Sequence, residues 1–195
     1  MGHLVITIGC EYGAKGNAIG RKIAEDLNIK FYNRDLVDEI IEEVGIPKEI
    51  MEKVEEGGTI AGKGAEGDVR GSFSKYADLT DRAIHVQKQI IRKLAEKESC
   101  VIIGRSADYI LKDRDDVLNV FIHGDMPEKT QRIMGLYNVE EKEAVKMMAD
   151  TDKRRMTNYN FYTEQKWGKA SNYTLCLNSS QLGYDRCEKI ILDCM

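Results

Sequence analysis

Three glycines and a lysine lie close together near the N-terminus, where Gly9, Gly13 and Gly16 surround Lys15 in the stretch GCEYGAKGN. Glycine tolerates positive φ angles, so a turn of this kind lets several backbone N–H groups face an anion. The residues before the turn (LVITI) are typical of a short buried strand, and apolar residues recur at helical spacing after it. A helix that begins here adds its partial positive charge. The pattern therefore predicts a phosphate-binding turn between a strand and a helix.

The turn matches part of the nucleotide-binding P-loop pattern GxxxxGK(S/T). Gly9 and Lys15 are in register with it, so Lys15 would lie beside the β- and γ-phosphates. Ala14 replaces the second glycine, and Gly16 and Asn17 stand at the hydroxyl positions. Because Asn17 offers an amide, Mg²⁺ would be held mainly by water and the nucleotide, and no protein metal ligand is predicted. The alternative is a glycine-rich turn with one solvated lysine.

Charged residues further along the chain could act on the same anion. Arg105 follows the apolar run 100–103, and ligands of open parallel sheets gather at the carboxyl ends of strands. Asp152 and Arg155 are three residues apart and share a helical face, and Arg132 lies within another helical pattern. The alternatives are a surface salt bridge for Arg105 and a solvated, charged helix end for the other residues.

Strand and helix patterns alternate along the chain. Short apolar runs predict strands at 4–8, 30–32, 100–103, 118–123 and 174–177. Amphipathic patterns predict helices at 19–27, 34–44, 48–55, 79–97, 127–137, 139–156 and 184–192. This alternation favours a three-layer α/β/α fold, with a five-stranded parallel sheet and helices on both faces. The glycine-rich segment 57–71 reads as a loop, either a substrate flap or disordered surface.

Composition limits the class of protein. A chain of 195 residues predicts one compact domain, and its apolar runs are too short to span a membrane. The N-terminus has no basic region, so no signal peptide is expected, and the odd number of cysteines (5) suits reduced thiols in the cytoplasm. The 3 histidines make no metal-site spacing with them. A net charge of −4 argues against nucleic-acid binding.

Three groups of motifs, in this order and spacing, resemble the cytidylate kinase-like branch of the nucleoside monophosphate kinases. The first group joins ITIGCEYGAKGNAIG to FYNRDLVDE, and the second joins SCVIIGRSADYIL to NVFIHGDMPEKTQRI. The third is DTDKRRMTNYNFYTEQKWGKASNYTLCLNSS, so the resemblance covers most of the chain. It implies a single P-loop kinase domain over 1–195, with an acceptor-side insertion at about 34–78 and a small helical lid at about 148–172.

The resemblance also implies roles for individual residues. The loop would hold ATP, with Mg²⁺, and Arg105 matches the family's arginine after the third strand, which would hold the acceptor phosphate or bridge to the transferred group. Asp152 and Arg155 match the D-x-x-R of the family's lid, and Arg132 matches its arginine on a neighbouring helix. The implied nucleotide-binding residues are Gly9, Gly13, Ala14, Lys15, Gly16 and Asn17. The implied catalytic residues are Lys15, Arg105, Arg132, Asp152 and Arg155.

Several features depart from the family pattern. Many close members lack the loop lysine that is present here, Met148 stands where cytidylate kinases have a further lid arginine, and the base-reading residues do not map onto this chain. The leading interpretation is a cytoplasmic, ATP-dependent kinase acting on CMP or dCMP, whose partners are small-molecule nucleotides. Two alternatives stay open: a kinase for another small phosphate acceptor, and a nucleotide-binding regulatory protein with little turnover. The sequence does not predict the oligomeric state.

Overall fold

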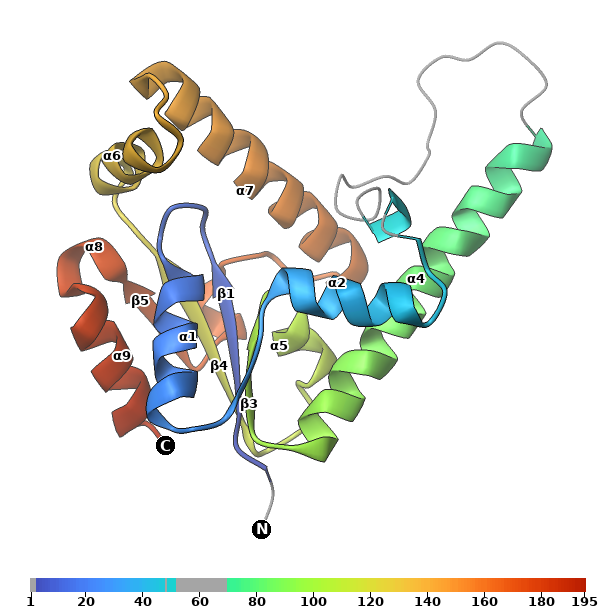
Figure 1. Cartoon of the computed structure of the whole chain (residues 1–195), viewed down its shortest axis with the longest axis horizontal. Coiled ribbons are helices and arrows are strands. Elements are labelled where there is room, and N and C mark those ends of the chain that lie inside the picture. Colours follow the sequence, from blue (N-terminus) through green and yellow to red (C-terminus); the bar gives the residue numbers. More distant parts are fainter. Residues whose placement is uncertain (1–2, 48, 52–69) are drawn as a thin grey trace.

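A five-stranded parallel sheet forms the centre of the molecule (Figure 1). The computed structural model describes residues 3–47, 49–51 and 70–195. The strands are β1 (Val5–Cys10), β2 (Lys30–Tyr32), β3 (Cys100–Ile103), β4 (Val117–His123) and β5 (Leu175–Asn178). Their order across the sheet is β2-β3-β1-β4-β5, which places β1 between β3 and β4. The turns that follow β1 and β3 therefore lie next to each other at the carboxyl edge.

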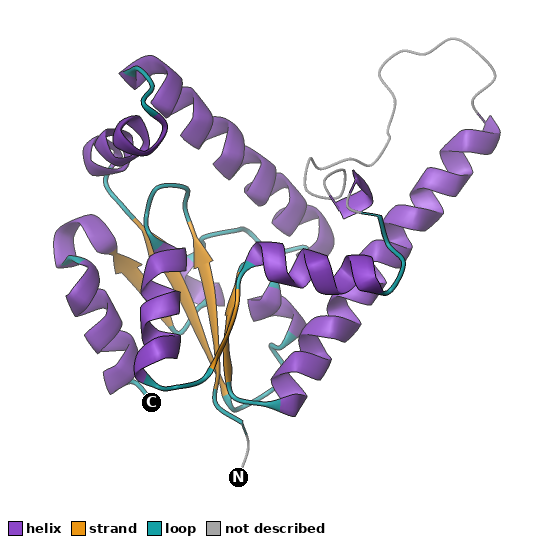
Figure 2. Cartoon of the chain, in the orientation of Figure 1, coloured by secondary structure: helices purple, strands orange, loops and turns teal. Residues whose placement is uncertain are grey.

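Helices connect the strands and cover both faces of the sheet (Figure 2). They are α1 (Gly16–Asp26), α2 (Arg34–Glu43), α4 (Arg70–Lys97), α5 (Ala107–Ile110), α6 (Met126–Tyr137), α7 (Glu141–Thr163), a 3₁₀ turn (Ala170–Asn172), α8 (Ser179–Leu182) and α9 (Tyr184–Asp193). Figure 1 shows α7 passing over the carboxyl ends of the strands, with α2 beside them. The site must therefore be sought under α7 and next to α2.

Alternating side chains of the buried strands build the two layers of the core. On one face, Ile6 and Ile8 of β1 pack with α1 and α9 in one cluster of buried apolar residues. On the other face, Val5 and Ile102 belong to a second cluster that contains buried residues of α2, α4 and α5. Strands buried on both faces read as continuous apolar runs, which is the pattern that predicted them. The three-layer α/β/α fold is confirmed.

Some predicted boundaries are wrong. Helix α4 begins at Arg70 rather than at residue 79, so the last two residues of the predicted loop, 70 and 71, are helical. Helix α7 continues to Thr163, seven residues beyond the predicted end, and the short helices α5 and α8 were missed. Most of the glycine-rich segment 57–71 lies outside the described residues, as does most of the helix predicted at 48–55.

Helices α6 and α7 form a small separate cluster. Ile133 of α6 packs with Ala144 and Met148 of α7, and all three are at most 2% exposed. Met148, at the position where the resemblance implies a lid arginine, is thus part of the apolar contact between the two helices. The predicted lid at 148–172 includes part of this pair, and its movement stays a prediction.

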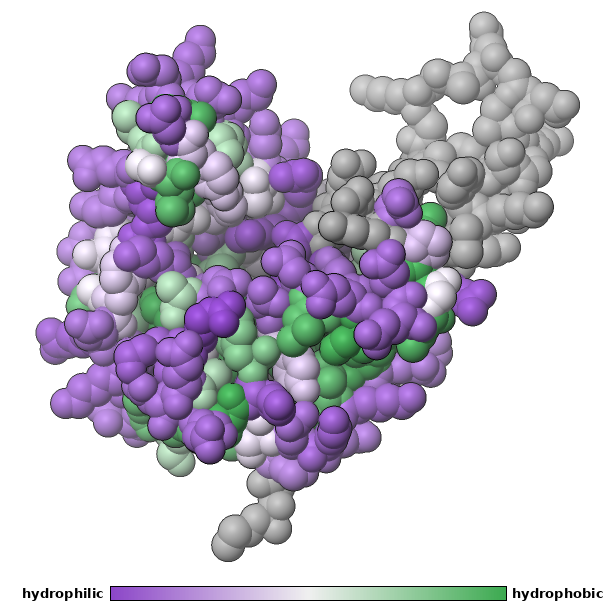
Figure 3. Space-filling view, viewed as in Figure 1, coloured by the Kyte–Doolittle hydropathy of each residue, from purple (hydrophilic) through white to green (hydrophobic). Residues whose placement is uncertain are grey.

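On the face seen in Figure 3 the surface is mostly hydrophilic, with hydrophobic residues gathered over α6 and where α2 meets α4.

Candidate functional site

The phosphate loop joins β1 to α1. Gly13 (φ +87°) and Lys15 (φ +61°) both adopt positive φ, and α1 begins directly after them. A Cβ at Gly16 would lie 2.5 Å from the Cβ of Cys10, so only glycine lets the helix start this close to the end of β1. The first N–H groups of α1 have no partners within the helix and face the loop. The predicted glycine-rich turn between a strand and a helix is present, and its binding of an anion stays a prediction.

Lys15 and Arg132 share an aromatic neighbour. The Lys15 Nζ lies 3.6 Å from the centre of the Tyr184 ring, and the Arg132 guanidinium lies 4.8 Å from the same centre. Burial and the charge of Arg132 lower the pKa of Lys15, and burial lowers the pKa of Arg132. Tyr184 is the first residue of α9, and sequence reasoning did not identify it. Cation–π contact with this ring offsets the close approach of the two positive charges.

Residues of α6 and α7 hold the backbone of the phosphate loop. Asp152 accepts a hydrogen bond from the Tyr12 N–H (2.7 Å), and Arg155 donates from Nη1 to the Cys10 carbonyl (2.9 Å). Arg132 donates to the Gly13 carbonyl at 2.9 Å. The resemblance implied that Asp152 and Arg155 belong to a lid over the nucleotide and that Arg132 lies on a neighbouring helix. The structure brings all three to the loop, through its backbone groups.

A buried ion pair fixes the loop from the side of α6. Lys129 donates from Nζ to Oε2 of Glu11 (2.6 Å), and its side chain is only 6% exposed. The stem of Lys129 fills the space beside Gly13, where a Cβ would come within 3.2 Å of it. Glu11 is therefore neutralised within the loop and leaves room for a phosphate. Sequence reasoning missed Lys129, which carries no motif of its own.

Arg105 occupies a tight turn after β3. Gly104, Arg105 and Ser106 all have positive φ (68°, 57° and 54°). For residues that carry a Cβ this conformation is strained, and such strain clusters at functional sites. The Arg105 side chain is 4% exposed and forms an ion pair with Asp38 of α2. Burial lowers the pKa of Arg105 to about 10, and Asp38 opposes that shift.

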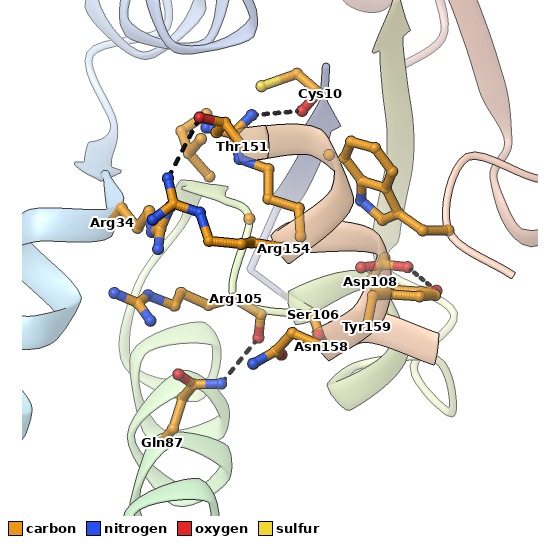
Figure 4. Close-up of a pocket in the computed structure, with 15 residues that line it drawn as sticks. Cys10, Arg34, Gln87, Arg105, Ser106, Asp108, Thr151, Arg154, Asn158 and Tyr159 are labelled. Carbon is orange, nitrogen blue, oxygen red and sulfur yellow. Dashed lines mark hydrogen bonds between the residues drawn. The ribbon is translucent and has the colours of Figure 1, made fainter. Parts of the chain in front are cut away.

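A cavity of about 130 Å³ lies between this turn, the end of β1 and α7 (Figure 4). The described residues that line it include four arginines: Arg34, Arg105, Arg154 and Arg155. Figure 4 shows Arg34, Arg105 and Arg154 approaching from three elements, α2, the turn after β3, and α7. Four guanidinium groups around one cavity provide charge and bidentate geometry for a phosphate or carboxylate. We call this cavity the arginine pocket.

Arg34 reaches the arginine pocket because of the way α2 begins. The Asn33 side chain accepts a hydrogen bond from the Leu36 N–H (2.9 Å), which caps α2 and fixes Arg34 as its first residue. Burial and the charges of Arg105 and Arg155 lower the pKa of Arg34 to about 9. The pocket thus concentrates positive charge that an anion would stabilise. An arginine directly after β2, at the carboxyl edge, is the sequence signal that could have found it.

The opposite wall of the pocket is aromatic and less charged. Tyr159 donates a hydrogen bond from its hydroxyl to Oδ2 of Asp108 (2.6 Å), and burial raises the pKa of Asp108. Trp167 packs edge-on against Phe121 of β4, with ring centroids 5.2 Å apart. Gln87 of α4 also lines the pocket, beside Arg105. Asn158, Tyr159 and Trp167, which belong to the segment that the resemblance implied as a lid at about 148–172, therefore line the pocket.

The structure separates the predicted residues into two groups. Arg105 and Arg155 line the arginine pocket together with Gly9, whereas Lys15 and Arg132 lie at Tyr184 on the other side of the loop. Ala14 is 1% exposed, with its carbonyl 3.0 Å from the Ser179 hydroxyl. Asn17 is exposed in the first turn of α1. Ala14 thus supports the loop by packing and, of the two, only Asn17 is open to a ligand.

The described part of the chain offers neither a protein metal site nor a membrane-spanning helix. No group of three or more His, Cys, Asp or Glu residues there could hold a metal ion. No helix within the same ranges is long and apolar enough to cross a membrane. Glu11, a carboxylate of the loop itself, is engaged by Lys129.

Comparison with known proteins identifies the fold and the family. A model of the cytidylate kinase-like family matches residues 5–181. The solved structure of an uncharacterized protein from Eubacterium ventriosum is 31% identical, has a TM-score of 0.76, and aligns over 98% of this chain and 97% of that chain. No curated protein matches the sequence.

Two solved kinases share the fold at low identity. A shikimate kinase from Bacteroides thetaiotaomicron is 15% identical, with a TM-score of 0.53 and coverage of 98% of this chain and 96% of that chain. A gluconokinase from Sinorhizobium meliloti is 16% identical, with a TM-score of 0.54 and coverage of 98% and 90%. These likenesses confirm the P-loop kinase fold and carry no information on substrate.

Proposed function

Because the chain belongs to the cytidylate kinase-like family, we propose that it transfers the γ-phosphoryl group of ATP to a nucleoside monophosphate, with CMP or dCMP preferred. The single observation that carries the proposal is the arginine pocket, which lies beside the phosphate loop and is lined by four guanidinium groups. Phosphoryl transfer needs chiefly positioning and positive charge around the moving group, and a phosphate loop next to such a pocket offers both.

The two groups of cations suit the two substrates. In this proposal the loop amides, Lys15 and Arg132 would hold the phosphates of ATP, and the arginine pocket would hold the acceptor phosphate. Arg155 lies at their boundary, because it lines the pocket and also hydrogen-bonds the Cys10 carbonyl at the end of β1. In this arrangement Arg155 and Arg105 would neutralise charge between the donor and acceptor phosphates during transfer.

A phosphorylated acceptor fits the charges of the pocket. The oxygen of a phosphate monoester is already anionic near neutral pH, so its attack on ATP requires no general base. Among the described residues that line the pocket, Asp108 is the one carboxylate, and it accepts a hydrogen bond from Tyr159. Four guanidinium groups beside one engaged carboxylate favour a dianionic substrate.

Magnesium would be held mainly by the nucleotide. Mg²⁺ keeps several waters and is usually bound through one or two protein ligands plus substrate phosphates. Asn17, exposed in the first turn of α1, is the residue of the loop that could add a carbonyl oxygen or a water contact. The ion would supply charge neutralisation between the β- and γ-phosphates when bound.

Asp108 also supports a second candidate function, a kinase for a small hydroxyl acceptor. Burial raises the pKa of Asp108, as is usual for a group that takes a proton from a hydroxyl.

A third possibility, a regulatory protein that binds nucleotide with little turnover, draws support from Lys15, whose Nζ lies on the Tyr184 ring. We also propose a cytoplasmic location, where ATP is available.

An assay of ADP release across acceptors tests the proposal. The purified protein with ATP and Mg²⁺ is given CMP, dCMP, UMP, AMP, GMP or TMP, with an acceptor-free control and with shikimate and gluconate as hydroxyl acceptors. We expect CMP or dCMP to give the highest kcat/KM. Use of a hydroxyl acceptor alone would favour the second candidate, and tight ATP binding with no acceptor used would favour the regulatory protein.

A further inference from the structure

The side chain of Gln87 has a fixed orientation in the arginine pocket. Gln87 lies on α4 and is 8% exposed, and its Nε2 donates a hydrogen bond to the Arg105 carbonyl at 3.2 Å. A backbone carbonyl only accepts hydrogen bonds, so the amide nitrogen must face Arg105. If the carboxamide were flipped, Oε1 of Gln87 would face the Arg105 carbonyl oxygen, and two hydrogen-bond acceptors would lie against each other. Its oxygen Oε1 is therefore fixed as an acceptor on the other side.

That oxygen is buried, and it has no hydrogen-bond partner among the described residues. A buried acceptor without a partner is unfavourable by an amount comparable to a lost hydrogen bond, and such groups are rare in folded proteins. Gln87 is one of the residues that line the arginine pocket. A ligand in the pocket that carries an N–H or O–H donor would satisfy Oε1.

The position of Gln87 indicates which part of the acceptor it meets. Figure 4 shows Cys10, at the end of β1, and Gln87, on α4, at opposite ends of the pocket, with Arg105 between them. An acceptor phosphate must lie near Cys10, because the phosphate loop follows that residue directly. The other end of a nucleoside monophosphate is its base, which then extends toward Gln87.

We propose that Oε1 of Gln87 selects the acceptor base by accepting a hydrogen bond from the exocyclic amino group of cytosine. This inference rests on the proposed function and names the residue that discriminates within it. Uracil presents a carbonyl at the same position, and two facing acceptors repel each other. A site built around a buried polar group rejects analogues that leave that group unpaired. Gln87 thereby favours CMP over UMP.

The test compares two glutamines of the same helix. Gln87→Met removes the acceptor with little change in shape, and Gln89→Met is the matched control, because Gln89 is exposed on α4 and contacts His85. For each variant and the wild type, kcat/KM is measured with CMP and with UMP, and the affinities of CMP and UMP are measured by calorimetry without ATP. We expect Gln87→Met to lower kcat/KM for CMP about tenfold and to change the value for UMP less than about threefold. Gln89→Met should leave both values at the wild-type level.

A change on the ligand side tests the same hydrogen bond in the wild-type protein. The 5′-monophosphate of 2-pyrimidinone riboside lacks the amino group and adds no new acceptor at that position. We expect the wild type to bind it about tenfold more weakly than CMP, and Gln87→Met to bind the two with similar affinity. If Gln87→Met does not fold, the weaker binding of this analogue by the wild type still supports the inference.

The failures of the two proposals are distinguishable. Equal losses for CMP and UMP in Gln87→Met, or equal affinity of the wild type for CMP and the analogue, would overturn the role of Gln87 and leave the kinase intact. If the wild type phosphorylated UMP efficiently and CMP poorly, the role of Gln87 would likewise be overturned and the kinase activity would stand. If no nucleoside monophosphate binds or is phosphorylated, the proposed function fails and the inference fails with it.

Discussion

The arginine pocket and the cations at Tyr184 are held in different ways. In the pocket, Arg105 is fixed by a turn with three successive positive φ angles and by its ion pair with Asp38. At the other side of the loop, Lys15 and Arg132 lie on the face of one aromatic ring. The first arrangement is built into the backbone and the core, and the second depends on contacts that a side chain can exchange at low cost.

Under the proposed function, this difference separates a preformed acceptor site from a donor site that rearranges when ATP binds. A ring stabilises a cation by about 0.5–2 kcal/mol, much less than a polyphosphate does in a partly dry site. We therefore expect Lys15 to leave Tyr184 when ATP binds, whereas Arg105 keeps its place. Pre-organisation on the acceptor side reduces the entropy lost on binding, and mobility on the donor side lets Lys15 follow the transferred group.

The largest effect is expected from Arg105→Met. The substitution removes a buried guanidinium and leaves Asp38 as a charge without its arginine, which typically destabilises a protein by about 3–5 kcal/mol. Turnover with the best acceptor should fall by two orders of magnitude or more, because contact with the acceptor phosphate is lost. Chemical denaturation and steady-state kinetics measure the two effects.

The double variant Arg105→Met/Asp38→Asn separates stability from function. Removing the remaining charge should restore most of the lost free energy of unfolding, while turnover stays low. If the double variant regained turnover, or if the single variant kept wild-type kinetics, Arg105 would be a structural residue and the pocket would not be the acceptor site.

A smaller effect is expected from Lys15→Met. Loss of a charge that acts in the transition state should raise the activation free energy of turnover by about 2–4 kcal/mol, and kcat should fall accordingly. The melting temperature should change little. Lys22→Met is the matched control, because Lys22 lies on the same helix, is 54% exposed and pairs with Asp26. Wild-type turnover in Lys15→Met would mean that Lys15 stays on Tyr184 throughout and that the donor site does not rearrange.

The sequence was sufficient for the fold because the buried strands alternate with amphipathic helices and the glycines mark the loop. Arg105 and Arg155 were found from motifs, and both line the pocket. Arg34, close behind β2, carried the same strand-end signal and was missed, although its exact place depends on the capping of α2 by Asn33. Gln87 could not be found in this way, because its position depends on the packing of α4 against the turn after β3.

The contacts of the Lys15 side chain also could not be predicted from the sequence. The motif places the residue at the loop, but the direction of a long side chain depends on which groups surround it in three dimensions. Tyr184 lies 169 positions further along the chain and becomes a neighbour only because α9 packs beside α1. The start of α4 was misplaced for a different reason, since residues 70–78 include one glycine and two serines, which have a lower helix propensity than alanine or leucine.

The smallest effect is expected on the melting temperature of Arg34→Met. Whether the melting temperature rises or falls tests whether the positive charge of Arg34 destabilises the pocket when no ligand is bound. Burial and the charges of Arg105 and Arg155 lower the pKa of Arg34 from its usual range to about 9, so the folded protein holds this proton less tightly than the unfolded chain does. Stability therefore rises as the pH is raised through about 9, and the full penalty is present at neutral pH. Removing the charge should leave the melting temperature of the ligand-free protein unchanged or raise it by about 1–3 °C.

Added phosphate should stabilise the wild type more than Arg34→Met, because the anion binds only the folded pocket. Arg21→Met is the control, since Arg21 is exposed and stacks on Phe31 at 4.7 Å. Differential scanning fluorimetry at pH 7 with and without phosphate measures both differences. If the melting temperature of Arg34→Met fell several degrees below that of the wild type, Arg34 would stabilise the fold in the absence of ligand. The contrast between a preformed acceptor site and a donor site that rearranges would then rest on Arg105 alone.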